Sequence, residues 1–141
     1  MPATKTPSRL LHTMLRVADL ERSLRFYVET LGMQLIRRED YPEGKFTLAF
    51  VGYGEEDANA TIELTHNWGR DDYQHGTAFG HLALQVVELH QTCRDLQRLG
   101  VEIVRQPGPM TFTSPDRSSP EQIAFIRDPD GYRIELIERP S

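Results

Sequence analysis

The sequence is poor in cysteine. Its 141 residues include one, Cys93, so no disulfide can form within the chain, and such usage is typical of a reducing compartment. Long apolar runs are also missing, and none approaches the roughly 20 residues of a membrane-spanning helix. Residues 1–9 (MPATKTPSR) lack the apolar centre of a signal peptide and are predicted to be an N-terminal extension. The sequence therefore predicts a cytoplasmic protein with no membrane partner.

Basic residues are outnumbered as well. There are 16 Lys and Arg against 21 Asp and Glu, which gives a formal net charge of −5. A broad nucleic-acid surface needs an excess of positive charge, so we expect no nucleic-acid partner. The composition, 38% hydrophobic and 26% charged, is that of a globular protein, and the length suits one domain with a real core.

An internal repeat is the most informative feature that the sequence does contain. LGMQLIRR matches LGVEIVRQ, TLAFV matches IAFI, and TIELT matches RIELI. Each copy reads as strand, helix and three strands, over about residues 10–67 and 80–138, within a single domain over 10–138. We therefore predict an α+β fold of paired βαβββ modules, whose curved mixed sheets carry helices on one face and leave the other face concave.

Two helices are predicted from apolar residues at helical spacing. The first follows Asp19, a favourable N-cap, and ends at Gly32; the second ends at Gly100. Their core-facing residues are predicted to be Leu20, Leu24, Tyr27, Val28 and Leu31 in the first helix and Leu89, Cys93, Leu96 and Leu99 in the second.

The repeat also pairs polar residues inside strands. His12 matches His81, Glu63 matches Glu135, and the interval between histidine and glutamate is similar in both copies. Strand alternation places all four on the face opposite the helices. Two imidazoles and two carboxylates suit a divalent transition metal. A lone histidine or glutamate on a strand is more often a structural or solvated residue, so the residues alone leave both interpretations open.

The motifs that carry these residues also resemble a known family. LLHTMLRV, LGMQL, LAFVGYG, IELTHNWG, GHLAL and DPDGYRIELIE are together similar to the glyoxalase I family of the vicinal oxygen chelate superfamily, over about residues 10–138. The resemblance implies metal ligands at His12, Glu63, His81 and Glu135, and a homodimer whose sites each combine the first pair of one chain with the second pair of the other. It favours the bacterial class that uses Ni²⁺ or Co²⁺, with Zn²⁺ as the alternative.

The same resemblance implies a reaction. It is the isomerisation of the hemithioacetal of methylglyoxal and glutathione to S-lactoylglutathione, by proton transfer through a metal-bound enediolate. This is the carbon–sulfur lyase activity of methylglyoxal detoxification, with glutathione as cosubstrate. Glu135 would be the base, and Glu63 chiefly a ligand that acts on the other substrate stereoisomer.

Substrate contacts are implied at four positions. Arg16 and Asn67 lie four residues after His12 and Glu63, on the same strand faces, and match glutathione-binding positions of the family. His81 is both a ligand and a substrate contact, and Arg105 matches a basic position that meets the glycyl carboxylate. One region departs from the family pattern: residues 107–122 are long, rich in Pro and Ser, and lack Lys, so Met110, Phe112 and Arg117 are candidates to cover the substrate.

Two other functions are compatible with the predicted fold. The first is another metal-dependent proton-transfer enzyme of the superfamily, such as an epimerase; the second is a metal-free protein that binds a small drug. The epimerase would need phosphate-binding cations, and the drug-binding protein would not need the complete set of two histidines and two glutamates.

Overall fold

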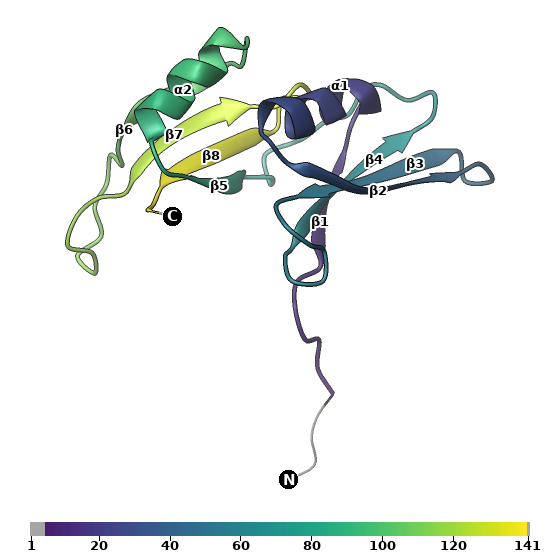
Figure 1. Ribbon diagram of the computed structural model, residues 1–141, viewed down its shortest axis with the longest axis horizontal. Helices are drawn as coiled ribbons and strands as arrows, with labels where there is room; N and C mark the ends of the chain where they lie inside the picture. The colour runs from purple at the N-terminus through teal and green to yellow at the C-terminus, as the bar shows by residue number, and fades with distance from the viewer. Residues whose placement is uncertain (1–4, 141) are drawn as a thin grey trace. The chain divides into compact units, whose positions relative to one another are not determined.

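The computed structural model describes residues 5–140, so the first four residues of the predicted N-terminal extension lie outside the described part. The chain divides into two compact units, Met1–Tyr73 and Gln74–Ser141. Each unit contains one four-stranded sheet with helical structure against it (Figure 1). Among the described residues, no helix has the length and apolar character needed to span a membrane.

The first unit follows the predicted order of strand, helix and three strands. Its elements are β1 (His12–Arg16), α1 (Leu20–Leu24), a π-helical segment η1 (Arg25–Thr30), β2 (Gln34–Tyr41), β3 (Phe46–Gly52) and β4 (Thr61–Asn67). The strand order is β1-β4-β3-β2. β1 runs parallel to β4, while the other pairs are antiparallel, so the sheet is mixed.

The second unit repeats this topology. Its elements are β5 (Leu82–Val86), α2 (Leu89–Arg98), β6 (Ile103–Pro109), β7 (Gln122–Arg127) and β8 (Arg133–Glu138). The order is β5-β8-β7-β6, again with one parallel pair, β5 and β8. The predicted α+β fold of paired βαβββ modules is therefore confirmed. One detail differs: His81 was predicted inside a strand but lies one residue before β5.

The first helical segment differs from the predicted regular helix. Asp19 caps α1 as expected, since its Oδ1 accepts from the Arg22 amide at 3.1 Å. The chain then widens into a π-helix, and the Leu31 amide donates to the Phe26 carbonyl five residues earlier. The wider turn changes which side chains face the sheet. The predicted core positions Leu24, Val28 and Leu31 are half-buried, and the buried residues are Leu20, Ser23, Phe26 and Tyr27.

Helix α2 packs on its sheet largely as predicted. Leu89, Cys93 and Leu96 are buried, and burial raises the pKa of the Cys93 thiol. Leu99 was predicted to face the core but is 65% exposed, because it follows the last turn of the helix as the C-cap residue. The start of α2 is tied to β8, since the Leu89 amide donates to Glu138 Oε2 at 2.9 Å.

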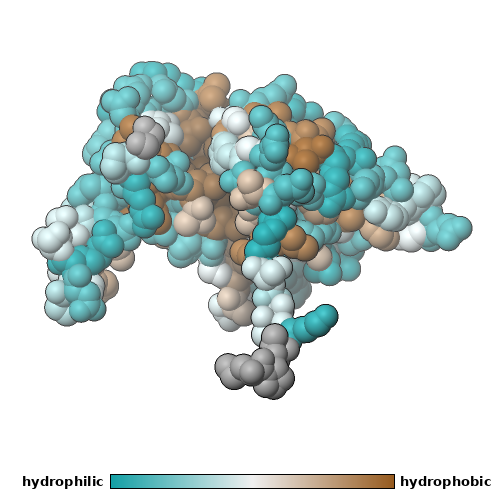
Figure 2. All heavy atoms as spheres, turned by 60° about the horizontal axis from the view of Figure 1, so that its bottom comes forward, coloured by the Kyte–Doolittle hydropathy of each residue, from teal (hydrophilic) through white to brown (hydrophobic). Residues whose placement is uncertain are grey.

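Strand alternation divides each sheet into a core face and an outer face. In β4, Ile62 and Leu64 are buried on the core side, while Glu63 between them is only partly buried. β8 repeats this pattern with Ile134, Leu136 and Glu135. β2 and β3 join through a turn at residues 42–45, and Figure 2 shows the end of this hairpin in hydrophilic colours.

Candidate functional site

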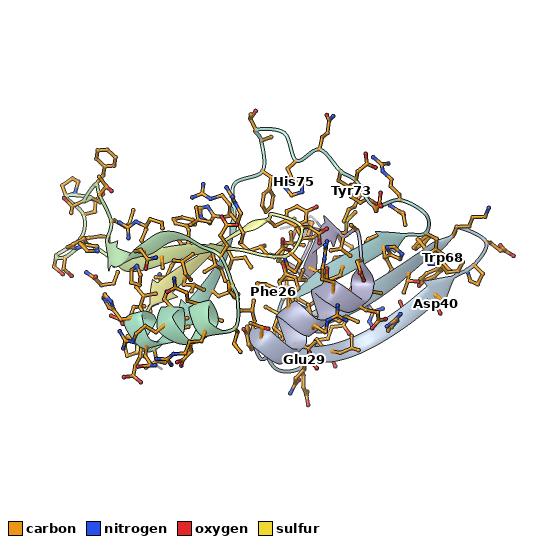
Figure 3. All side chains as sticks on the ribbon, turned by 90° about the horizontal axis from the view of Figure 1, so that it is seen from above. Phe26, Glu29, Asp40, Trp68, Tyr73 and His75 are labelled. Atoms are coloured by element: carbon orange, nitrogen blue, oxygen red, sulfur yellow. The ribbon has the colours of Figure 1, made fainter. Side chains whose placement is uncertain are left out.

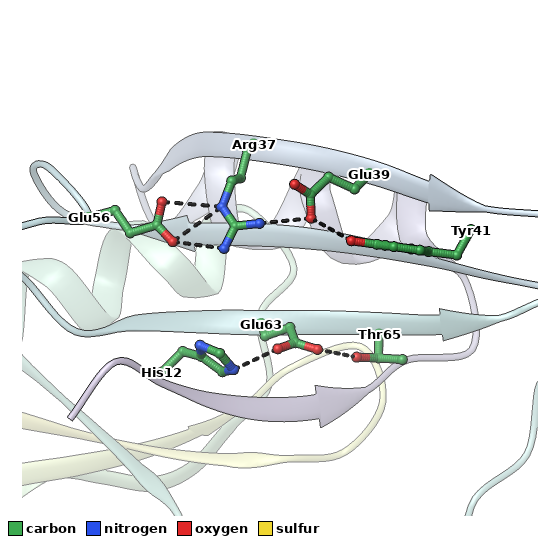
Figure 4. Close-up of polar contacts among 7 residues, drawn as sticks. All are labelled: His12, Arg37, Glu39, Tyr41, Glu56, Glu63 and Thr65. Atoms are coloured by element: carbon green, nitrogen blue, oxygen red, sulfur yellow. Dashed lines mark hydrogen bonds and ion pairs between the residues drawn. The ribbon is translucent and has the colours of Figure 1, made fainter. Parts of the chain in front are cut away.

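The first candidate half-site is a histidine–glutamate pair on β1 and β4. His12 Nε2 lies 2.7 Å from Glu63 Oε2, and the two side chains are 34% and 14% exposed (Figure 4). The two strands are parallel neighbours, and Met14 pairs with Glu63 across them. The sheet therefore brings together two residues that are far apart in the sequence and keeps both within reach of a ligand.

The second unit has an equivalent half-site. His81 Nε2 lies 3.2 Å from Glu135 Oε1, with side-chain exposures of 38% and 14%. Ala83, two residues after His81, pairs with Glu135, just as Met14 pairs with Glu63 in the first unit. The sequence repeat is thus also a repeat of geometry.

A phenylalanine stands beside each histidine. Phe50 of β3 pairs with Glu63, and its ring lies nearly perpendicular to the His12 imidazole, with the ring centroids 5.3 Å apart. Phe125 of β7 pairs with Glu135. Its ring centroid lies 5.1 Å from that of His81, again nearly perpendicular. Such edge contacts hold an imidazole in one orientation.

A guanidinium group covers each of these rings. Arg37 Cζ lies 3.6 Å from the centroid of Phe50, and Arg133 Cζ lies 4.5 Å from that of Phe125. Arg37 belongs to β2 and Arg133 to β8, so the two units reach the same arrangement from different strands. Arg37 also donates to Glu56 and Glu39, and this pairing holds the pKa of Glu56 below its ordinary value (Figure 4).

The donor set of each half-site fits a divalent transition metal. Imidazole nitrogen and carboxylate oxygen are both good ligands for first-row ions, and they face each other at the surface of each sheet. Thr61, on the same face of β4, has a buried Oγ1 without a hydrogen-bond partner in the described part of the chain. Within residues 5–140, however, no three His, Cys, Asp or Glu side chains converge. Each unit thus supplies two donors of a predicted set of four.

The predicted glutathione contacts Arg16 and Asn67 lie near the ends of β1 and β4. Arg16 is exposed, and the Asn67 side-chain amide donates to the Tyr73 hydroxyl at 3.1 Å. Arg70 in turn covers the ring of Tyr73, with Cζ 4.5 Å from the ring centroid. The segment after β4 therefore folds back on Asn67 and fixes its side chain.

The neighbouring Trp68 anchors the same segment to the sheet. Its indole N–H donates to Thr47 Oγ1 at 2.9 Å, and that hydroxyl donates to Asp40 Oδ1 at 2.7 Å. Figure 3 shows Trp68 and Asp40 close together in the first unit. This hydrogen-bond chain across β4, β3 and β2 fixes the backbone next to Asn67.

Arg105, the fourth predicted substrate contact, is held by backbone carbonyls of its own unit. Its guanidinium donates to the backbone carbonyls of Gly108 and Ile123 at 3.0 and 2.9 Å, and also to the Pro109 carbonyl. These bonds span two register shifts in the pairing of β6 with β7. The Arg105 side chain therefore stabilises the irregular part of β6.

The segment that departs from the family pattern lies between β6 and β7. β6 extends to Pro109, so the connection is residues 110–121. Phe112 is 83% exposed and Met110 is 37% exposed, and Arg117 is also exposed. Their side chains are available to contact a ligand.

Several residues of the half-sites were missed from the sequence. Phe50 and Phe125 occupy matched places in the repeat segments TLAFV and IAFI, so the repeat itself carried a signal for them. Thr65 shares a strand face with Glu63 by alternation, but its hydrogen bond to that carboxylate, at 3.1 Å, needed the side-chain conformation. Arg37 matches Arg105 in the repeat segments LGMQLIRR and LGVEIVRQ, but its position over the Phe50 ring needed the side-chain conformation.

Comparison with known proteins gives one family over nearly the whole chain. Residues 9–136 match the Glyoxalase/Bleomycin resistance protein/Dioxygenase superfamily. A protein named probable lactoylglutathione lyase from Synechocystis sp. is 55% identical over 132 residues, which are 94% of this chain and 96% of the relative. The lactoylglutathione lyase of Neisseria meningitidis serogroup A is 52% identical, with coverage of 94% and 92%.

This chain is also similar in structure to a solved protein. The crystal structure of glyoxalase I from Zea mays matches 94% of this chain with 41% identity and a TM-score of 0.85. This chain spans 45% of the maize chain. The two βαβββ units together are therefore similar to part of a larger plant protein and to nearly the full length of the bacterial relatives.

Proposed function

The chain belongs to the Glyoxalase/Bleomycin resistance protein/Dioxygenase superfamily, and we propose that it acts there as a lactoylglutathione lyase in methylglyoxal detoxification. The observation that carries this proposal is the recurrence of a histidine–glutamate pair at equivalent places in both sheets. The substrate is the hemithioacetal of methylglyoxal and glutathione, and the product is S-lactoylglutathione.

The four half-site residues His12, Glu63, His81 and Glu135 would hold one divalent metal ion. We favour Ni²⁺ or Co²⁺ over Zn²⁺, because the histidine at the first ligand position, His12, and the short chain resemble the bacterial class of the family that uses these ions. When bound, such an ion supplies Lewis acidity, which stabilises negative charge that develops on the two substrate oxygens.

Each complete site would combine residues of two subunits. His12 and Glu63 come from one subunit, and the matching histidine and glutamate of the second half-site come from its partner in a homodimer. The presence of one histidine–glutamate pair in each unit is consistent with this arrangement. The two units together then form one functional domain over residues 10–138. The single buried cysteine fits a cytoplasmic location.

The chemical step is a proton transfer between neighbouring carbons. The Glu135 carboxylate removes the proton from the carbon bonded to sulfur and returns it to the adjacent carbon. The half-buried position of Glu135, 14% exposed beside Phe125, limits the access of water to the proton in transit. Glu63 serves chiefly as a ligand and acts as base on the other substrate stereoisomer.

The glutathione moiety would be bound by Arg16 and Asn67, with His81 close to the reacting carbons. Arg16 is exposed near the end of β1, and a guanidinium binds a carboxylate in a bidentate manner. Asn67 is held by Tyr73, so its side chain has a fixed direction before the substrate arrives. Arg105 donates to backbone carbonyls of its own unit and contributes to binding through the shape of β6.

The experiment that tests this function follows thioester formation at 240 nm. Metal-free protein is reconstituted separately with Ni²⁺, Co²⁺ and Zn²⁺ and mixed with methylglyoxal and glutathione. We expect turnover with Ni²⁺ and Co²⁺ that exceeds turnover with Zn²⁺. No thioester with any of the three ions would refute the proposed activity.

The role of the base is tested by one substitution. Glu135→Gln keeps the size of the side chain but removes its basicity, so kcat should fall by about 10²–10⁴-fold. Lys45→Gln, at the exposed β2–β3 turn, is the matched control and should keep full activity. Full turnover in Glu135→Gln would assign the proton transfer to another group.

A further inference from the structure

Glu63 has both of its carboxylate oxygens engaged. Oε2 lies 2.7 Å from His12 Nε2, and Oε1 accepts a hydrogen bond from Thr65 Oγ1 at 3.1 Å (Figure 4). Thr65 is two residues further along β4, on the same face, and is 7% exposed. A buried hydroxyl therefore fixes the second oxygen of this carboxylate.

Glu135 is the equivalent glutamate of the second unit, and it lacks this support. Two residues after it, where β4 has Thr65, β8 has Ile137. Within the described residues, the polar partner of the Glu135 carboxylate is His81 at 3.2 Å. Its second oxygen has no donor from the described part of its own chain.

Burial does not distinguish the two glutamates. Each side chain is 14% exposed, and each pairs across the sheet with a phenylalanine. The difference between them is therefore the hydroxyl group and the freedom of the carboxylate to turn. Turning Glu63 away breaks its hydrogen bond with Thr65 and leaves a buried hydroxyl unsatisfied, whereas turning Glu135 breaks no such bond.

We infer that Thr65 is a positioning residue, which holds Glu63 chiefly in its role as a ligand and so favours Glu135 as the group that transfers the proton. The inference rests on the proposed lyase activity and explains why two equivalent carboxylates would differ in that reaction. Groups that orient ligands in this way commonly change metal affinity or activity 10- to 100-fold when they are removed.

The step assigned to Glu135 balances without any further reactant. Glu135 takes the proton from the carbon bonded to sulfur, and the electron pair of that C–H bond moves between the two carbons. The same carboxylic acid returns the proton to the neighbouring carbon, while the hydroxyl proton passes from the first oxygen to the second. The first carbon ends as the thioester carbonyl and the second as the alcohol, so no oxidant is needed.

The first test measures metal binding without turnover. Thr65→Val replaces the hydroxyl by a methyl group of similar size, and Co²⁺ titration of the metal-free protein should show affinity weakened 10- to 100-fold. Thr65→Ser keeps the hydroxyl and should restore affinity to within about threefold of the wild type. Co²⁺ affinity in Thr65→Val equal to that of the wild type would overturn the inference.

The second test asks which glutamate moves the proton. The fold loss of kcat caused by Glu135→Gln is divided by the fold loss caused by Glu63→Gln. This ratio is measured first in the wild-type background and then in the Thr65→Val background. Release of Glu63 should let it share the transfer, so this ratio should fall at least about tenfold. An unchanged ratio would show that the hydroxyl does not assign the roles.

The mirror substitution introduces the missing hydroxyl. Ile137→Thr places a donor beside Glu135, and we expect kcat to fall about tenfold with little change in KM. Unchanged kcat would count against the inference. Wild-type protein that forms no thioester would refute the proposed function itself, whereas active wild type with unaltered Co²⁺ binding in Thr65→Val would refute only the role of Thr65.

Discussion

The guanidinium of Arg37 lies over the ring of Phe50, with Cζ 3.6 Å from the ring centroid. The ring is 2% exposed and stands nearly perpendicular to the His12 imidazole. Arg37 is held in turn by two carboxylates, Glu56 at 2.9 Å and Glu39 at 2.7 Å. A series of contacts thus connects the outer strand β2 to the first half-site.

Phe50→Leu should weaken both the fold and the half-site. The smaller side chain leaves part of a buried site empty and removes the aromatic contact with His12, so the free energy of unfolding should fall by about 1–2 kcal/mol. Co²⁺ affinity should fall with it, because the imidazole loses the ring that orients it. Urea unfolding and Co²⁺ titration measure the two effects.

Phe46→Leu is the matched control for Phe50→Leu. Phe46 lies at the other end of β3, and its ring stacks on Tyr41 at 4.8 Å. We expect some loss of stability and unchanged Co²⁺ affinity. Equal effects of both substitutions on Co²⁺ binding would mean that the ring beside His12 has no special role.

Glu56→Gln should destabilise the protein at neutral pH and not in acid. The hydrogen bond from Arg37 lowers the pKa of Glu56 in the folded state below its ordinary value. A lowered pKa stabilises the fold above the ordinary value of about 4.3, and this contribution is lost as pH falls through the folded pKa.

Urea unfolding of wild type and Glu56→Gln at pH 7, 5, 4 and 3 checks this dependence. The difference between the two midpoints should be constant from pH 7 to 5 and close toward pH 3. Glu55→Gln, at the exposed neighbouring position, should track the wild type at every pH. A difference that grows in acid would contradict the sign of the pKa shift.

Arg105→Ala should act on stability rather than directly on the substrate. It leaves the carbonyls of Gly108 and Ile123 without a donor, and a lost bond to a charged donor costs about 1.5–3 kcal/mol. Arg105→Lys should recover little, because an ammonium cannot reproduce the planar fork. Unchanged unfolding with a large rise in KM would instead support the direct substrate contact inferred from sequence.

Glu138→Ala should destabilise helix α2. The Glu138 carboxylate accepts from the Leu89 amide at 2.9 Å and so replaces a local N-cap. Loss of a capping group costs about 1 kcal/mol, which a shift of the thermal midpoint will show. Glu88, the residue at the N-cap position, makes no side-chain capping bond, so Glu88→Ala should have a smaller effect.

The repeat explains why so much of the fold was predictable. LGMQLIRR and LGVEIVRQ encode equivalent strands, so each copy supported the assignment of the other. Hydrophobic alternation around Glu63 and Glu135 was enough to place both carboxylates off the core face, where the structure has them.

The errors lie in the winding and the length of the helices. Leu24, Val28 and Leu31 were assigned to the core by a period of 3.6 residues, but after Leu24 the chain widens into a π-helix at Arg25–Thr30, which moves Val28 and Leu31 from that spacing. No local signal in the sequence distinguishes the two windings. Leu99 has the right spacing for the core, yet α2 ends at Arg98.

The sequence by itself determined the repeated topology and the residue types of the two half-sites, because alternation, spacing and turn residues are local properties of the chain. Tertiary structure decided which groups touch. The distance from His12 to Glu63, the ring of Phe50 between His12 and Arg37, and the hydroxyl of Thr65 on Glu63 all depend on how neighbouring strands register and which rotamers fit between them. The difference in hydrogen bonding between Glu63 and Glu135 follows from one side chain at matched places of β4 and β8, Thr65 against Ile137.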